Sequence, residues 1–314
     1  MADVIKCATR DAYGAALKEL GARDDILVLD ADLAKATKTI TFKKEFPEKF
    51  IDCGIAEGNM MGVAAGLAAS GYTVFASSFA MFAAGRAFEQ VRNSIAYPKL
   101  NVKIGATHAG ISVGEDGASH QCCEDIALMR SIPGMVIINP ADDVEAKAAV
   151  HAAAAHEGPV YMRFGRLAVP RVNSEDYKFE LGKGVELRSG KDVTIVATGL
   201  MVNEALIAAD TLKEEGIDAR VINIHTIKPI DKDILVKAAK ETGAIVTAEE
   251  HSIIGGLGSA VSEVLAEEYP VPVVRLGVND TFGKSGPALE LLKIFGLDAA
   301  NIVEKAKKAV SLKK

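Results

Sequence analysis

The sequence has no tryptophan, and aromatic residues make up only 5% of its 314 positions. It also has no excess of basic residues, because 36 Lys and Arg stand against 42 Asp and Glu, a net charge of -6. This balance gives no general electrostatic reason to bind nucleic acid. Hydrophobic residues make up 49% of the chain and charged residues 25%, which indicates a globular protein.

Cysteines are few, and the four that occur form no C-x-x-C pair: Cys7, Cys53, Cys122 and Cys123. This spacing indicates neither a zinc site nor a disulfide framework, so we expect reduced thiols and no metal ligands. The first residues lack the apolar core of a signal peptide, and no run of about 18 apolar residues predicts a membrane span. We therefore expect a cytoplasmic protein.

Two nucleotide and nucleophile signatures are also missing, the P-loop and the G-x-S-x-G elbow. The glycines of EEHSIIGGLGSAV (249–261) come close to G-x-G-x-x-G without matching it. We interpret this stretch as a structural turn, with His251 at a domain or subunit interface.

Strand and helix patterns alternate along the chain, which is typical of βαβ units and a mostly parallel sheet. We therefore expect an α/β protein of two domains, each a mostly parallel sheet flanked by helices. The irregular, polar stretch 169–190 is interpreted as a linker between domains at 1–168 and 191–314. The predicted strands are 24–33, 50–55, 72–76, 100–106, 135–138, 192–199, 219–227, 244–250 and 271–278, and the predicted helices are 8–20, 59–70, 80–96, 143–156, 203–215, 231–241, 256–268 and 299–311.

One carboxylate, Glu57, stands in a stretch of almost only small and apolar residues, from Phe50 to Phe82. Such a side chain loses hydration on folding, which favours its protonated form. A carboxyl group of this kind can exchange protons near neutral pH. The alternative is a water-facing Glu in the first turn of a helix, where it gains a few tenths of a kcal/mol from the helix dipole.

The loop THAGISVGEDGASHQCCED follows the strand predicted at 100–106 and contains His108, Glu115, Asp116 and His120. Its three glycines allow the backbone to approach a ligand closely, and its histidines can donate to oxygens or relay protons. Two histidines twelve residues apart are weak evidence for a metal site. A polar surface turn is the alternative interpretation.

Two further groups of residues are candidates for ligand contacts. Phe79 and Phe82 could form a wall for a flat aromatic ligand, although an aromatic pair at helical spacing is more often part of a core. Arginine grips phosphate with two hydrogen bonds, so the candidate anion binders are Arg10, Arg163 and Arg166.

Several motifs in one order resemble the pyrimidine-binding domain of transketolase, and the resemblance continues through the second half of the chain. These motifs are GIAEGNMMGVAAGLA, SSFAMF, THAGISVGEDGASHQ, ALMRSIPGMVIINPADDVEA and VYMRFGR. The resemblance implies an enzyme that uses thiamine diphosphate to move a two-carbon ketol unit from a ketose phosphate to an aldose phosphate. It also implies a place in the pentose phosphate pathway.

The resemblance carries roles over to particular residues. The Glu that matches Glu57 protonates the aminopyrimidine ring of the cofactor, and the aromatic wall of that ring matches Phe79 and Phe82. An acid near the cofactor matches Asp32. The residues that contact sugar hydroxyls match His108, Asp116 and His120, with the two histidines as catalytic groups, and the arginines that hold the sugar phosphate match Arg10 and Arg163. Departures are Gly85, where the family has Tyr, and 35–37, where a phosphate-binding Ser is expected.

A further absence shapes this interpretation. Full-length transketolases have an N-terminal domain whose GDG motif and following Asn bind Mg²⁺ and diphosphate, and no GDG occurs here. The resemblance therefore implies the C-terminal half of a split transketolase, with Mg²⁺ held mainly by an N-terminal partner subunit in an (αβ)₂ assembly, or a homodimer of the chain alone. The alternatives are a subunit like deoxyxylulose phosphate synthase, a 2-oxo acid dehydrogenase β-type subunit, and a scaffold homologue without catalysis.

Overall fold

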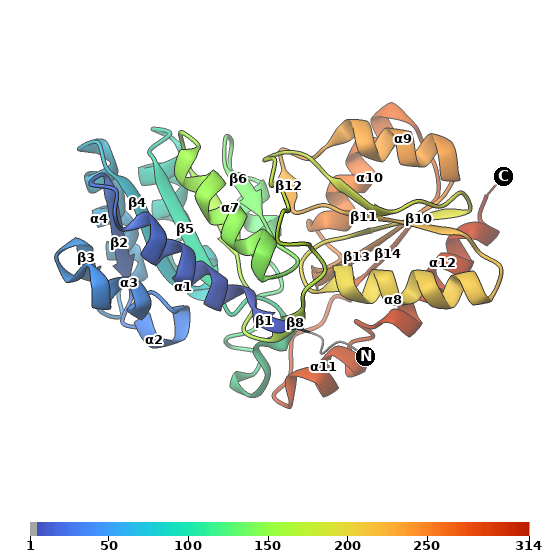
Figure 1. The fold of residues 1–314 in the computed structure, drawn as a ribbon, viewed down its shortest axis with the longest axis horizontal. Helices are drawn as coiled ribbons and strands as arrows, with labels where there is room; N and C mark the ends of the chain where they lie inside the picture. Colours follow the sequence, from blue (N-terminus) through green and yellow to red (C-terminus); the bar gives the residue numbers. More distant parts are fainter. Residues whose placement is uncertain (1–4, 314) are drawn as a thin grey trace.

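The computed structural model describes residues 5–313, which form two α/β domains side by side (Figure 1). Each domain has its own mainly parallel sheet with helices on both faces, so the predicted fold class is confirmed. Residues 1–4 and 314 of the predicted domains lie outside the described residues. The boundaries at 168 and 190 stay a prediction.

The first domain is built on a seven-stranded sheet with the order β12-β6-β7-β5-β4-β2-β3. All its neighbouring strands are parallel except the β12-β6 pair at one edge. The two central strands β4 and β5 are buried along their whole length, as expected for strands covered on both faces. The strands of this sheet that come from the first half of the chain are β2 (Ile26–Asp30), β3 (Phe50–Asp52), β4 (Thr73–Phe79), β5 (Val102–Thr107), β6 (Val136–Ile138) and β7 (Val160–Arg163).

Helices cover this sheet in two layers. On one face α1 (Thr9–Leu20) packs against α7 (Asp143–Ala155), and their alanines let the two helices lie close to the strands. Short helices, α2 (Ala34–Thr37), α3 (Ile40–Glu45) and η1 (Pro47–Lys49), connect β2 to β3. The other face is covered by α4 (Glu57–Ala69), η2 (Met81–Arg86), α5 (Phe88–Gln90), η3 (Val91–Ala96) and α6 (Asp125–Arg130).

The prediction of one continuous α-helix at 80–96 is wrong. Two π-helical stretches, η2 and η3, flank the three residues of α5. A π-helical turn accommodates an extra residue and is frequent at functional sites. The feature matters here because η2 contains Phe82.

The second domain has a five-stranded sheet with the order β14-β13-β10-β11-β9. The edge strand β9 is antiparallel to β11 and lies inside the stretch that the sequence predicts as a linker. Figure 1 shows α9 and α10 on one side of this sheet and α8 and α12 on the other. The bounds are β9 (Val185–Arg188), β10 (Val193–Ala197), α8 (Met201–Glu214), β11 (Ala219–Asn223), α9 (Lys232–Thr242), β13 (Ile245–Ser252), α10 (Leu257–Glu268), β14 (Val273–Val278), α11 (Ala288–Ile294) and α12 (Ala299–Ser311).

The two domains are joined by more than the chain connection. The strand predicted at 219–227 is in fact two strands, because after β11 the chain crosses over and β12 (Thr226–Lys228) pairs with β6 of the first sheet. A second small sheet pairs β1 (Lys6–Ala8) with β8 (Ala168–Pro170). One hydrophobic cluster continues from Ile137 of the first domain to Ile227 and Leu235 of the second. The domains therefore share a core.

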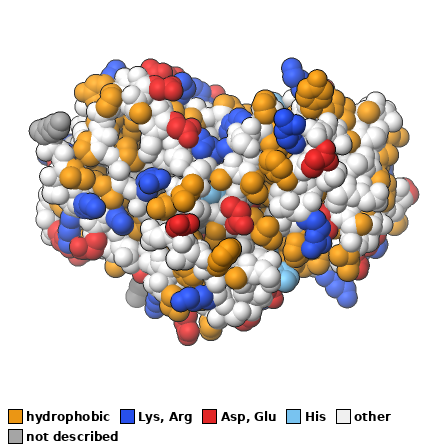
Figure 2. Space-filling view, turned by 180° about the vertical axis from the view of Figure 1, so that it is seen from behind, with side chains coloured by type: hydrophobic (Ala, Val, Ile, Leu, Met, Phe, Trp, Pro, Cys, Tyr) orange, Lys and Arg blue, Asp and Glu red, His pale blue; other side chains and the backbone are white. Residues whose placement is uncertain are grey.

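On the face opposite to that of Figure 1, acidic and basic side chains are mixed with hydrophobic ones (Figure 2). This mixture agrees with the acidic net charge and gives no basic surface on that face for nucleic acid. Among residues 5–313, no helix is both long and apolar enough to cross a membrane.

Candidate active site

The predicted site residues gather where neighbouring parallel strands end, at the carboxyl edge of the first sheet. Phe79 is the last residue of β4, and His108 follows directly after β5. Asp32 lies two residues after β2, and Glu57 lies five residues after β3. These four strands are consecutive in the sheet, in the order β5-β4-β2-β3. Ligands of α/β proteins bind at this edge because the connecting loops meet there.

Glu57 is the first residue of α4, and only 1% of it is exposed. Its burial agrees with the sequence analysis, but the carboxylate has a charged partner that the sequence analysis missed. Arg86 donates a hydrogen bond from Nη1 to Oε2 of Glu57 over 2.9 Å. The same guanidinium lies 4.7 Å from the centroid of the Phe82 ring. Arg86 therefore links the carboxylate to the predicted aromatic wall.

The two phenylalanines form one aromatic cluster with the two histidines of the sugar-contacting motif. Phe79 and Phe82 stack with ring centroids 6.0 Å apart and an interplanar angle of 18°. His108 stacks on Phe79 at 3.8 Å, and the edge of His120 meets Phe82 at 5.4 Å. Glu57, both phenylalanines and both histidines thus lie in one connected site.

His108 is buried and held in one protonation state. Its Nε2 lies 2.8 Å from Nη1 of Arg10, and its Nδ1 lies 2.9 Å from Oγ1 of Thr107. Arginine can only donate, so Nε2 accepts and Nδ1 carries the proton. Burial, with the positive charges of Arg10 and Arg166, lowers the pKa of His108 to about 3. The imidazole is therefore neutral at physiological pH.

Positive charge collects beside this histidine. Arg10 is half-buried, and burial lowers its pKa, with a smaller contribution from the charge of Arg166. Arg166 donates to the carbonyl of Val113 and, over 3.1 Å, to the carboxylate of Glu115. Two neighbouring guanidinium groups that depress each other's basicity form a favourable place for an anion.

The structure contradicts the phosphate-binding role predicted for Arg163. Only 3% of this residue is exposed, and its Nε donates to the buried carboxylate of Asp125 over 2.9 Å. Its Nη2 donates to the carbonyls of Cys122 and Glu250. Arg163 is thus a buried structural ion pair between the domains. Arg166, three residues later, has the exposure that Arg163 lacks.

The two predicted acids, Asp32 and Asp116, are both exposed. Asp32 has a positive φ of 61° in the turn after β2. The buried carboxylate of Asp30 holds this turn by accepting from the amide of Leu33 and from the hydroxyls of Thr37 and Thr39. Burial raises the pKa of Asp30 to about 6.

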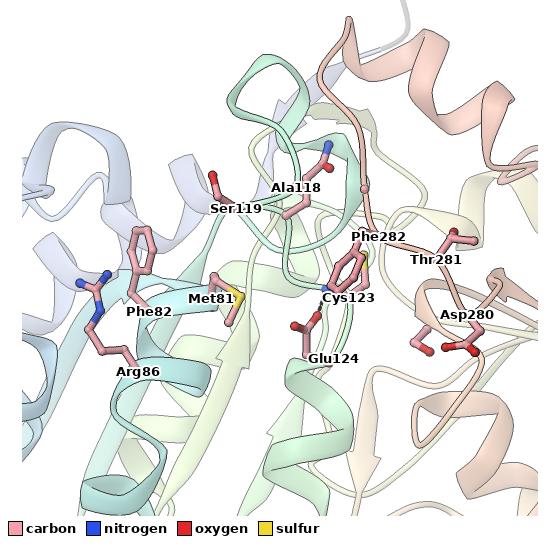
Figure 3. Close-up of a pocket in the computed structure, with 13 residues that line it drawn as sticks. Met81, Phe82, Arg86, Ala118, Ser119, Cys123, Glu124, Asp280, Thr281 and Phe282 are labelled. Carbon is pink, nitrogen blue, oxygen red and sulfur yellow. Dashed lines mark hydrogen bonds between the residues drawn. The ribbon is translucent and has the colours of Figure 1, made fainter.

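A cavity of about 570 Å³ opens beside the cluster (Figure 3). Phe82 and Arg86 lie on one side of it, Asp280 and Phe282 of the second domain lie on the other, and Glu124 lies between them. The sequence signals only Arg86, which follows Phe82 by four residues. The others come from distant segments that only the fold brings together.

The glycine-rich stretch 255–258 is a structural turn, as predicted. The carboxylate of Glu249 accepts from the amides of Leu257 and Gly258 at the start of α10. The chain itself thus fills the helix terminus at which a nucleotide phosphate would bind. His251 is fully buried and contacts the amide of Ala127 in α6, so it lies at the domain interface.

Two family models together match most of the chain. The transketolase pyrimidine-binding domain matches residues 5–171, and the transketolase C-terminal domain matches residues 182–302. This chain belongs to the transketolase family. Its two domains correspond to those two transketolase domains.

Three similar proteins agree with this assignment. A putative transketolase C-terminal section of Methanocaldococcus jannaschii is 54% identical over 94% of this chain and 94% of its own. A solved structure titled split gene transketolase, inactive beta4 tetramer, is 58% identical, with a TM-score of 0.90 over 98% of this chain and 99% of that one. The Pichia stipitis transketolase in complex with sedoheptulose 7-phosphate has a TM-score of 0.83 at 26% identity, and 99% of this chain matches 46% of it.

Transketolases use thiamine diphosphate, and the residues of this site fit its aminopyrimidine ring. A half-buried aromatic face, that of Phe82, borders the cavity, and the buried carboxylate of Glu57 is tied to it through Arg86. An aromatic face and a carboxylate are what a flat, protonatable heterocycle requires. Within residues 5–313, no group of three His, Cys, Asp or Glu could hold a metal ion.

Proposed function

We propose that this chain is the C-terminal subunit of a split transketolase. With an N-terminal partner, it transfers a two-carbon ketol unit from a ketose phosphate to an aldose phosphate. The observation that carries the proposal is the Glu57–Arg86–Phe82 contact beside the His108 and His120 rings, at the edge of one sheet.

The carboxylate and the aromatic rings serve the cofactor end of this site. Thiamine diphosphate, when bound, supplies the carbon nucleophile of the reaction. Glu57 exchanges a proton with a ring nitrogen of the aminopyrimidine, and Arg86 keeps the carboxylate in place during this exchange. Phe79 and Phe82 exclude water and fix the plane of the ring, while Asp32 lies at the same sheet edge.

The histidines and arginines serve the sugar end. His108 is neutral, so it acts as a hydrogen-bond partner for sugar oxygens, and its Nε2 accepts. Half-exposed His120 can donate or accept a proton, and the exposed carboxylate of Asp116 can accept from a hydroxyl. Arg10 and Arg166 hold the phosphate, with Arg166 in the place first predicted for Arg163.

The partner supplies what this chain lacks. Mg²⁺ needs several oxygen ligands in octahedral array, and the described part of the chain offers no such group. The chain matches 46% of the Pichia stipitis enzyme, which leaves more than half of that protein without a counterpart here. We propose that an N-terminal subunit with a GDG motif and an Asn binds Mg²⁺ and diphosphate, in an (αβ)₂ assembly in the cytoplasm.

The alternative activities and the scaffold hypothesis receive less support. The relatives at 54% and 58% identity are both described as transketolases, and neither is described as a deoxyxylulose phosphate synthase or a dehydrogenase. A scaffold has no physical need for a buried Glu57 beside an open aromatic face. The inactive tetramer named for the similar structure concerns that protein without its other subunit type, and it agrees with a need for a partner.

Reconstitution tests this proposal. The chain is mixed with a partner containing GDG and Asn, thiamine diphosphate and Mg²⁺, and sugar products are measured with sedoheptulose 7-phosphate as donor and glyceraldehyde 3-phosphate as acceptor. We expect transfer by the mixture and negligible transfer by either chain alone. Robust turnover by this chain alone would overturn the split-subunit proposal. Condensation of pyruvate with glyceraldehyde 3-phosphate would instead favour the synthase alternative.

A further inference from the structure

The loop that contains His108, Asp116 and His120 has little regular structure of its own. We name residues 108–121 the sugar loop. Its only helical part is η4 (Ile111–Asp116), a 3₁₀ stretch interrupted by non-helical backbone at Gly114. Such a loop needs contacts from outside to hold three side chains in fixed positions.

These contacts come from the second domain. The amide of Ser112 donates to the buried carboxylate of Glu250 in β13 over 2.5 Å. Ile111 is fully buried in the hydrophobic cluster of the second domain. The segment 281–287, which we name the clasp segment, lies along the loop between β14 and α11.

Gln121, the last residue of the sugar loop, joins the loop to the clasp segment. Only 4% of it is exposed, and its Nε2 lies 3.0 Å from the carbonyl of Ile111 and 2.9 Å from the carbonyl of Lys284. A third carbonyl, that of Gly114, lies 3.4 Å away. Carbonyls only accept, so they fix the orientation of the carboxamide. One amide group thus bonds the start of the loop to the other domain.

Glycines permit this close approach. A methyl group on Gly283 would lie 1.8 Å from Oε1 of Gln121, and one on Gly117 would lie 2.3 Å from Oγ of Ser285. The φ of Gly283 is not in the left-handed region, so only space prevents a side chain there. Gly117 directly follows Asp116, so the contact with the clasp segment also fixes the backbone beside that carboxylate.

We propose that Gln121 is a positioning residue through which the second domain sets the geometry of the sugar loop. In the enzyme proposed above, on which this inference rests, Gln121 acts on sugar binding through His108, Asp116 and His120. It touches neither Glu57 nor Phe79, which lie on other elements. Its substitution therefore separates sugar binding from cofactor binding.

The first measurement uses the chain without any substrate. Hydrogen–deuterium exchange is compared for the wild type, Gln121→Leu and Gly283→Ala, with Gly286→Ala as a matched control. Gly286 lies in the same clasp segment, and a methyl group there meets only the side chain of Leu291, at 3.2 Å. We expect faster exchange in 108–121 for the first two variants and unchanged exchange for the control. Exchange in β4 and β2 should remain slow in all of them, which shows that each variant is folded.

The second measurement uses the enzyme assembled with its partner. We expect Gln121→Leu and Gly283→Ala to raise the KM for sedoheptulose 7-phosphate by about ten-fold or more, with the apparent affinity for thiamine diphosphate unchanged. In a double-mutant cycle, Gly283→Ala should have no further effect on a Gln121→Ala background, because the methyl group then has no amide to displace.

The outcomes decide between the two levels of the proposal. Unchanged loop exchange in Gln121→Leu, or additive effects in the cycle, would overturn the positioning role. Equal losses of sugar and cofactor affinity would also overturn it, because they indicate general destabilisation. If the wild-type assembly transfers nothing, the proposed function fails, while the exchange data still decide whether Gln121 holds the loop.

Discussion

Arg86 donates a hydrogen bond to the buried carboxylate of Glu57 over 2.9 Å, and its guanidinium lies over the ring of Phe82. This pair couples the proton-exchanging group to the surface that orients its substrate ring. About half of the Arg86 side chain remains exposed, whereas 1% of Glu57 does. The carboxylate therefore depends on Arg86 more than Arg86 depends on the carboxylate.

Replacing Arg86 by Met should leave Glu57 buried without a charged partner. We expect a loss of about 1–2 kcal/mol in the free energy of unfolding, less than for a fully buried pair because water already screens the guanidinium. Urea unfolding of the isolated chain measures this. Arg92→Met is the control, since Arg92 is exposed and its side chain donates only to neighbouring Asn93. Equal effects of the two substitutions would contradict the role given to Arg86.

Arg163 and Arg166 should respond in opposite ways to the same substitution. Arg163→Met leaves the buried Asp125 without its ion partner, so we expect a loss of about 3–5 kcal/mol in stability. Arg166→Met should change stability little, because its partner Glu115 is exposed. In the assembled enzyme it should instead raise the KM for phosphorylated sugars by about ten-fold or more, through the loss of a bidentate phosphate contact.

Unfolding curves of the two isolated variants, together with steady-state kinetics of the Arg166→Met assembly, check this pair of predictions. A stable Arg163→Met chain with a raised KM would restore the role first predicted for Arg163. An unchanged KM in the Arg166→Met enzyme would remove Arg166 from the phosphate site.

Glu250 should make stability depend on pH. Burial raises its pKa to about 7 from a value of 4.5 in the unfolded chain, despite the opposing charge of Arg163. Between these values the folded chain binds more protons than the unfolded chain, so stability falls as pH rises. We expect Glu250→Gln, which keeps an acceptor for Ser112, to gain on the order of 2 kcal/mol relative to wild type between pH 5 and pH 8.

Urea unfolding at several pH values measures this difference, with Glu267→Gln as the control at an exposed position of α10. All other titrating groups are shared by the chains, so their contributions cancel in the difference. A difference that does not change with pH would show that Glu250 is ionised throughout this range.

The alternation of strands and helices and the positions of the site residues after strand ends could be predicted from the sequence, because both follow from local patterns. The transfer of β12 to the other sheet could not, because strand pairing between domains leaves no local signal. The π-helical turns at Phe82 were also missed, since the apolar spacing of residues 80–96 suits an α-helix as well.

Arg163 and Arg166 show a second limit of the sequence. They stand three residues apart, and only the end of β7 decides that one points into the domain interface and the other toward the sugar loop. Gln121 and Glu250 are a third case, because their contacts join segments more than 130 residues apart. Motif matching found the loop, but it could not find what holds the loop.

The most direct test of the account is Glu57→Gln in the assembled enzyme. Turnover of sedoheptulose 7-phosphate is measured for the wild-type and variant chains, each combined with the partner subunit, Mg²⁺ and thiamine diphosphate, and assembly is checked by sedimentation. The account predicts intact assembly and a loss of several orders of magnitude in turnover, because an amide cannot exchange the proton. Near-normal turnover in a correctly assembled Glu57→Gln enzyme would contradict the central role of this carboxylate.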